Sequence, residues 1–325
     1  MAESAGRRWV YVTGMPRSGT TFAATVLTAA RGVMMLHEPF NPQCGVLGVD
    51  WERAKHLGEG LAPPEDAREA IGRMLRLRVR QGSHVPPSDP LVRRMVKRLA
   101  GSRGPYHLRR SKLRPWCQAG VVKDPTGWSL SAHLSDEHGL PVVVTVKHPL
   151  AQVAGYQRAG WTAKVKFFDP GSPLLGLLDE EDRRLMEQYG GGDADPLEAA
   201  AVSWRLTYRV LLGWARERSA WRVAVMEQLS ADPGERFSVL AGEVGLPWDR
   251  WSDRAIQRMT GGHNPAEARP GRFQDLKRDS RRVFELRRAS LSAAERARVF
   301  ELTWPVANEI YDEESFGLSD GEKES

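Results

Sequence analysis

The feature that most constrains the fold is a glycine-bounded loop between a strand-like run and a helix-like run. Trp9–Thr13 is short and β-rich, the loop Gly14–Thr21 follows it, and Phe22–Ala30 has the pattern of a helix. Backbone N–H groups at the start of such a helix point outward, and the helix dipole favours an anion there. The order of strand, loop and helix therefore predicts an anion site at one edge of a sheet.

The rest of the chain repeats the alternation of strand and helix. Short runs of buried-strand character are Val33–Leu36, Val121–Lys123, Pro141–Lys147 and Trp221–Met226. Helices are expected at Glu65–Arg80, after the Asp195-Pro196 cap, at Phe237–Val244 and at Ala293–Tyr311. We therefore expect an α/β protein with a three-layer, P-loop-like fold, in which helices flank a central parallel sheet.

Length and composition limit the other possibilities. We expect one domain over residues 1–325, with an irregular basic insert at about 43–115 and a loop or lid region at about 161–192. Cys44 and Cys117 are the only cysteines, which excludes a disulfide scaffold, and they lack metal-ligand spacing. No targeting segment is evident, and no apolar stretch approaches the roughly 20 residues of a membrane span. We expect a cytoplasmic protein without a metal.

The net charge of +6 indicates an anionic partner, and the basic residues are unevenly placed. Residues 73–114 hold 13 Lys or Arg against one acidic residue, and residues 269–288 hold eight against three. Few aromatic residues accompany the first stretch, and no nucleic-acid-binding module is recognisable in it. We expect no nucleic acid partner.

The loop Gly14-Met-Pro-Arg-Ser-Gly-Thr-Thr21 has the outline of a P-loop, with Thr20 where a nucleotide kinase has Lys. Arg17, Ser18, Thr20 and Thr21 add donors to the backbone amides. The missing Lys makes the loop poorly suited to a nucleoside triphosphate. A P-loop kinase or another nucleotide phosphotransferase is the alternative function. If the loop binds no anion, it is a glycine-rich turn with an incidental Arg.

The segment Pro16–Thr21 resembles the 5′-phosphosulfate loop of sulfotransferases that use 3′-phosphoadenosine 5′-phosphosulfate (PAPS). The resemblance implies that the 5′-phosphate and the sulfuryl group are held by Arg17, Ser18, Gly19, Thr20 and Thr21, and Arg17 is also expected to be catalytic.

The family binds the 3′-phosphate with a basic residue in an Arg-x-Pro pattern and a Ser eight residues later. Lys147 matches the first position with Lys for Arg, and Gly155 departs from the second. Arg158 or Tyr156 could replace the missing hydroxyl. A late basic segment of the family resembles Phe273–Ser280, which implies Lys277 and Arg278 as phosphate ligands. If these residues bind no phosphate, Lys147 is a Lys at a strand end, and the late basic segment is a solvated helix face.

The resemblance also implies the catalytic groups. Glu38 in Leu36–Phe40 has the spacing from Arg17 of the base in tyrosylprotein sulfotransferases, and several carbohydrate sulfotransferases carry Glu-Pro here. Lys123-Asp-Pro125 resembles their segment with the charge-stabilising Lys. Pro125 replaces the His base of cytosolic sulfotransferases, which favours Glu38. His37 is a weaker base candidate. If the two residues have no catalytic role, Glu38 is a solvated carboxylate before a Pro turn, and Lys123 is a surface residue at a strand end.

Two further roles complete the implied site. Asp124 is expected to orient Lys123 or Arg17, and Glu227 in a Glu-Asp-Leu-like stretch is expected to hold loops by hydrogen bonds.

These matches imply an enzyme that moves the sulfuryl group of PAPS to an acceptor hydroxyl by in-line transfer, with Glu38 as base and adenosine 3′,5′-bisphosphate as product. The composition, rich in Arg, Ala and Gly, resembles that of a GC-rich bacterial genome. A small natural product of secondary metabolism, a glycoside or a lipid is the expected acceptor. Its contacts are expected from residues 43–115 and 161–192.

Overall fold

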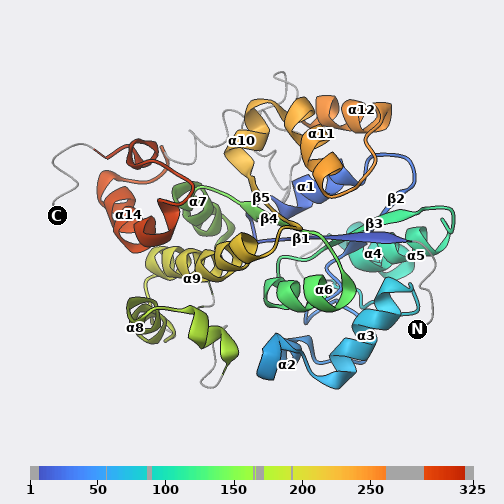
Figure 1. Ribbon diagram of the computed structural model, residues 1–325, viewed down its shortest axis with the longest axis horizontal. Helices are drawn as coiled ribbons and strands as arrows, with labels where there is room; N and C mark the ends of the chain where they lie inside the picture. The colour runs from blue at the N-terminus through green and yellow to red at the C-terminus, as the bar shows by residue number, and fades with distance from the viewer. Residues whose placement is uncertain are drawn as a thin grey trace.

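In the computed structural model the five expected strands form one parallel sheet (Figure 1). The structure describes residues 7–55, 57–85, 90–163, 165, 172–191, 193–260 and 289–318. The strand order is β2-β3-β1-β4-β5. The strands are β1 (Arg8–Thr13), β2 (Val33–His37), β3 (Ala119–Lys123), β4 (Val142–Val146) and β5 (Trp221–Val225).

Helices cover both faces of the sheet, so the predicted three-layer α/β architecture is confirmed (Figure 1). One core contains Val10 and Val12, and the other contains Trp9 and Tyr11, as the alternation of a strand requires. The first face is covered by α1 (Thr20–Leu27), α10 (Met226–Ala231), α11 (Pro233–Glu243) and α12 (Arg250–Thr260). The second is covered by α3 (Glu65–Leu75), α6 (Ser131–His138), α7 (Pro149–Ala159), α9 (Pro196–Glu217) and α14 (Ala293–Ala307).

Helix boundaries follow local chemistry that the apolar pattern does not show. The α1 helix begins at Thr20, two residues before the predicted start, because Gly19 takes the N-cap position. The α3 helix ends at Leu75 instead of Arg80, and Leu77 there has a positive φ of 59°. Asp195 caps α9 as predicted, by accepting from the amides of Leu197 and Glu198.

Residues 43–115 are more helical than the irregular pattern predicts. They contain α2 (Trp51–Ala54), η1 (Glu59–Leu61), α3, α4 (Leu91–Ala100) and α5 (Arg103–Lys112). The α5 helix packs beside the edge strand β2, where Ser111 Oγ donates to the Met35 carbonyl at 3.1 Å. This contact satisfies an edge carbonyl of the sheet.

The described part of residues 161–192 contains η3 (Pro173–Leu177) and α8 (Glu180–Tyr189). Buried Arg205 of α9 holds α8 through Asp182, with Nε and Oδ1 at 2.6 Å. Of the helices in the described ranges, none is both long enough and apolar enough to traverse a bilayer.

Candidate active site

The loop Gly14–Gly19, called the phosphate-type loop below, joins β1 to α1. Its backbone is tightly constrained. A Cβ on Gly14 would lie 2.3 Å from the Thr145 carbonyl oxygen, so only glycine fits beside β4. Arg17, which is not a glycine, has φ +77°. Because the first amides of a helix lack intrahelical acceptors, the loop presents donors at the start of α1.

Side chains from β4, from α7 and from Lys147 between them hold this loop, and the Met15 amide donates to the Tyr208 hydroxyl of α9. Ser18 is buried, and its hydroxyl lies 2.7 Å from Thr145 Oγ1. The carbonyls of Pro16 and Arg17 accept from Gln152 Nε2 at 2.5 Å and from Lys147 Nζ at 2.8 Å. The hydroxyl of Ser18 thus contributes to the shape of the loop, and its amide donates to Met15 O within the turn.

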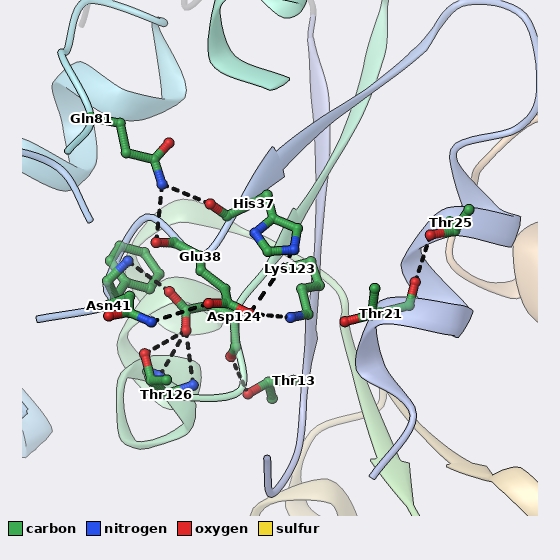
Figure 2. Close-up of polar contacts among 12 residues, drawn as sticks. Thr13, Thr21, Thr25, His37, Glu38, Asn41, Gln81, Lys123, Asp124 and Thr126 are labelled. Carbon is green, nitrogen blue, oxygen red and sulfur yellow. Dashed lines mark hydrogen bonds and ion pairs between the residues drawn. The ribbon is translucent and has the colours of Figure 1, made fainter. Parts of the chain in front are cut away.

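The most prominent polar contact of the site is the ion pair between Lys123 and Glu38 (Figure 2). Lys123 Nζ lies 2.5 Å from Glu38 Oε1, and the ammonium is almost fully buried. In the sheet register Lys123 is opposite His37, so Glu38 follows directly, and its amide donates to the Lys123 carbonyl at 2.7 Å. The structure therefore brings together two residues that lie 85 positions apart.

Asp124 positions the Glu38 loop and contacts neither Lys123 nor Arg17 by hydrogen bond, which corrects the predicted role. Its Oδ2 accepts from the Phe40 amide at 2.6 Å, and its Oδ1 accepts from Thr126 and Gly127. The buried carboxylate is fully used by these donors. Backbone amides from two turns, one at Phe40 and one at Thr126 and Gly127, converge on this carboxylate at the end of β3 and take the place of Lys123 and Arg17 as its donors.

Two residues that the motifs did not indicate also hold Glu38 (Figure 2). Asn41 Nδ2 donates to Glu38 Oε2 at 3.1 Å, and Gln81 Nε2 donates to the carbonyls of His37 and Glu38 at 2.7 and 3.1 Å. The spacing of Asn41, three residues after Glu38, is a weak local signal, whereas nothing near Gln81 in the sequence points to this contact.

The ion pair keeps Glu38 ionised. Burial raises the pKa of the carboxyl, but the Lys123 ammonium, His37 and the hydrogen bonds from Lys123 and Asn41 outweigh it and hold the pKa at about 2. Burial, followed by the Lys123 ammonium, lowers the pKa of His37 to about 3. At neutral pH Glu38 is therefore a carboxylate and the imidazole of His37 is neutral.

His37 has a nitrogen without a partner in this environment. Its Nε2 is buried, has no hydrogen-bond partner in the described part of the chain, and lies 4.0 Å from Glu38 Oε1. The ring stacks on His107 of α5, with centroids 5.8 Å apart and planes 10° apart. An unpaired buried nitrogen costs about 1–3 kcal/mol, so this position suits a polar ligand atom.

The predicted 3′-phosphate residues lie where β4 meets α7. Lys147 follows β4 and contacts the phosphate-type loop through the Arg17 carbonyl. Gly155 lies within α7, and a Cβ built there meets no atom within 4 Å. Tyr156 is buried next to Trp161, whose ring lies 5.5 Å from the Arg17 guanidinium. Lys277 and Arg278 lie outside the described residues.

Glu227 holds loops by hydrogen bonds, as predicted. Its Oε1 accepts from the His148 amide at 3.1 Å, and its Oε2 accepts from the Tyr311 hydroxyl at 3.1 Å. Burial raises the pKa of this carboxyl, and these donors counteract the rise. Glu227 of α10 therefore joins the start of α7 and the segment after α14.

No family model and no curated protein matches the chain. Among solved structures, it is similar to the sulfotransferase domain of the Synechococcus PCC 7002 olefin synthase, with 16% identity, TM-score 0.43 and coverage of 96% of this chain and 98% of that one. It is also similar to the sulfotransferase domain of the curacin biosynthetic pathway, with 14% identity, TM-score 0.48 and coverage of 94% and 98%. A third is sulfotransferase STF9 from Mycobacterium avium, with 12% identity, TM-score 0.43 and coverage of 95% and 78%. Sulfotransferases are also the class of protein that the motifs of the sequence resemble.

Proposed function

We propose that this chain is a PAPS-dependent sulfotransferase that acts on a hydroxyl group. The observation that carries the proposal is the buried Lys123–Glu38 pair at the carboxyl ends of β3 and β2. Strand β1, which leads into the phosphate-type loop, lies beside β3 in the same sheet. Ligands of open α/β sheets bind at this edge, so an anion in the loop comes close to a cation and a carboxylate.

These groups supply what in-line sulfuryl transfer needs. The acceptor oxygen forms a bond to sulfur while the bond from sulfur to the 5′-phosphate oxygen breaks. Glu38 takes the proton of the acceptor hydroxyl, and Lys123 stabilises the negative charge that develops on the leaving phosphate. The loop amides and Arg17 hold the 5′-phosphosulfate, and Lys147 with the start of α7 holds the 3′-phosphate.

The ion pair links donor binding to the creation of the base. A carboxylate with a pKa of about 2 is a weak base while it is paired with Lys123. A phosphosulfate in the loop attracts the Lys123 ammonium, and Glu38 then loses the cation that lowers its pKa. Its basicity rises when the donor is in place, which favours ordered binding with the donor first.

An acceptor hydroxyl between Glu38 and His37 fits this proposal. An oxygen about 2.8 Å from each group reaches both Glu38 Oε1 and His37 Nε2, which are 4.0 Å apart. The unpaired nitrogen of His37 then gains a hydrogen bond, and the hydroxyl is oriented with its proton toward the carboxylate.

Binding measurements separate this function from that of a P-loop kinase. Thr20 is nearly buried at the start of α1 and supplies no cation for the β- and γ-phosphates of ATP. We expect adenosine 3′,5′-bisphosphate to protect the chain against thermal unfolding and ATP with Mg²⁺ to leave the melting temperature unchanged. Tight Mg²⁺-dependent ATP binding would overturn the proposal. A screen of alcohols with PAPS, read by mass for sulfated product, then identifies acceptors.

Lys147→Ala is expected to weaken binding of adenosine 3′,5′-bisphosphate about 10- to 100-fold, because an ionic hydrogen bond to phosphate contributes about 1.5–3 kcal/mol. Binding of adenosine 5′-phosphosulfate, which lacks the 3′-phosphate, should change less than about threefold. Isothermal titration measures both, and Lys147→Arg is the control that keeps the charge. Equal losses for the two nucleotides would assign Lys147 to the loop alone, through its bond to the Arg17 carbonyl.

Gly155→Ser is expected to tighten binding of adenosine 3′,5′-bisphosphate about three- to tenfold. The open space beside Gly155 accepts a side chain, and a hydroxyl there adds one hydrogen bond of about 0.5–1.5 kcal/mol. Gly155→Ala is the control, because it gains the same kind of helix propensity without a hydroxyl. If both variants bind the nucleotide equally well, the hydroxyl has no part in 3′-phosphate binding.

A further inference from the structure

The α4 helix has two chemically opposite sides in its sequence. Its apolar residues stand at positions 91, 92, 95, 96 and 99, and its basic residues at positions 93, 94, 97 and 98. On a helix of 3.6 residues per turn, the first set lies along one side and the second along the other. A helix with this pattern normally buries its apolar side against the protein core.

Here the described apolar side chains of α4 are exposed. Leu91 and Val92 are each 75% exposed, and Met95 is 61% exposed. The exposure continues along the chain, since Tyr106, Leu113 and Trp116 are 50%, 75% and 64% exposed. Within the described residues, six of the 11 exposed large hydrophobic side chains therefore fall between positions 91 and 116. We take this concentration of exposed apolar side chains in one segment of the chain as the sign of an interaction surface.

The charge of the same segment has a single sign. Residues 90–118 contain nine Lys or Arg and no Asp or Glu. An extended surface of uniform negative charge complements this segment. Protein interfaces are depleted in Lys and usually pair charges of both signs, and a nucleic acid backbone makes no use of an aliphatic stripe.

We propose that α4 and the segment through Trp116 bind the surface of an anionic lipid bilayer. The α4 helix lies in the interface, with Leu91, Val92 and Met95 among the upper acyl chains and Arg94 at the headgroups. Trp116 takes the interfacial position that indole rings favour. In this mode the helix lies on the bilayer and does not cross it.

The chain leads from α4 to the active site through α5. This helix follows α4 after Gly101 and Ser102, and its His107 stacks on His37 beside Glu38. We infer, on the basis of the proposed function, that the acceptor is an amphiphilic alcohol held in the bilayer. Its hydroxyl reaches Glu38 from the α5 side while its apolar part stays in the lipid.

Vesicle sedimentation of the full chain tests the surface. We expect at least tenfold stronger partitioning onto vesicles of equal phosphatidylglycerol and phosphatidylcholine than onto pure phosphatidylcholine, and weaker partitioning at 300 mM than at 50 mM NaCl. Equal partitioning onto both vesicles would overturn the proposal. Binding of a duplex oligonucleotide at a salt concentration where vesicles stay unbound would also overturn it, in favour of a nucleic acid surface.

Variants locate the binding on α4. Leu91→Ser with Met95→Ser should reduce partitioning at least fivefold, and Arg93→Gln with Arg94→Gln should weaken the salt dependence of partitioning, since seven of the nine basic residues remain. Val239→Ser on α11, where the side chain is 56% exposed, is the matched control and should bind like the wild type. Unchanged binding of adenosine 3′,5′-bisphosphate shows that each variant is folded. Wild-type partitioning of the Leu91/Met95 variant would overturn the assignment to α4.

A lipid alcohol tests the acceptor class. Hexadecanol in anionic vesicles is the probe, PAPS is the donor, and sulfated product is read by mass. Sulfation by the wild type and its loss in the Leu91/Met95 variant support the inference. Vesicle binding without sulfation of hexadecanol, in a chain that sulfates short soluble alcohols, would overturn the acceptor class alone. Absence of binding to both PAPS and adenosine 3′,5′-bisphosphate would overturn the proposed function and leave the surface intact.

Discussion

Glu38→Gln is expected to abolish sulfuryl transfer while nucleotide binding stays nearly intact. The amide is almost isosteric with the carboxylate but accepts no proton, and general base catalysis contributes about 10²–10⁴ in rate. Turnover is measured with PAPS and an acceptor found by the alcohol screen, and binding with adenosine 3′,5′-bisphosphate. A variant that turns over at the wild-type rate would show that another group is the base.

The same variant changes stability in a way that depends on pH. The folded pKa of Glu38, about 2, lies below its ordinary value of 4.5. Its pairing therefore stabilises the native state above about pH 4.5 by about 3 kcal/mol, and this contribution is lost as the pH falls through 2. In Glu38→Gln, this part of the pH dependence of the free energy of unfolding should be absent, as followed by urea denaturation from pH 7 to pH 3.

Lys123→Met is expected to lower turnover by about 10²–10³, because it removes the cation that stabilises the leaving phosphate. It also leaves Glu38 without its ion-pair partner, and breaking a buried pair on one side costs about 3–5 kcal/mol. Methionine retains much of the volume of the lysine stem, so the loss of stability reports on charge. Steady-state kinetics and urea denaturation measure the two effects separately.

The double variant Glu38→Gln with Lys123→Met separates catalysis from folding. Both charges are absent, so much of the stability lost in Lys123→Met should return, while turnover stays abolished. If restored stability brought back turnover, the pair would be a structural ion pair, and its role in the chemistry would be refuted.

The strands of the fold were predictable because each is a short and mostly apolar run, and β2, β3 and β4 are buried on both faces. The strand order was not, because nothing within Val33–Leu36 or Val121–Lys123 shows that these runs become neighbours. Glu38 and Lys123 were therefore predicted as separate strand-end residues, and their direct ion pair comes from the register of β2 with β3. The role of Asp124 was mistaken for a similar reason, since three of its four donors are backbone amides that no side-chain motif reveals.

Of the helices within residues 43–115, α3 was predicted with its start at Glu65, whereas α2, α4 and α5 were not. The α4 helix follows Pro90 and has no side-chain cap, so no local signal marks its start. Exposed apolar residues on α4 also break the usual rule that the apolar side of a helix faces the core. Local sequence rules are expected to fail where a segment has a partner outside the fold.

The backbone at Arg17 and Glu38 has a consequence for evolution and engineering. These are two of the four non-glycine residues with positive φ in the described chain, at +77° and +51°. Left-handed backbone at such residues costs about 1–3 kcal/mol, which a glycine would relieve. Selection for thermostability alone would therefore favour glycine at both positions and remove the base and the guanidinium together. Substitutions at these two positions that raise thermal stability are therefore expected to lower turnover. Engineering for stability should leave Arg17 and Glu38 unchanged.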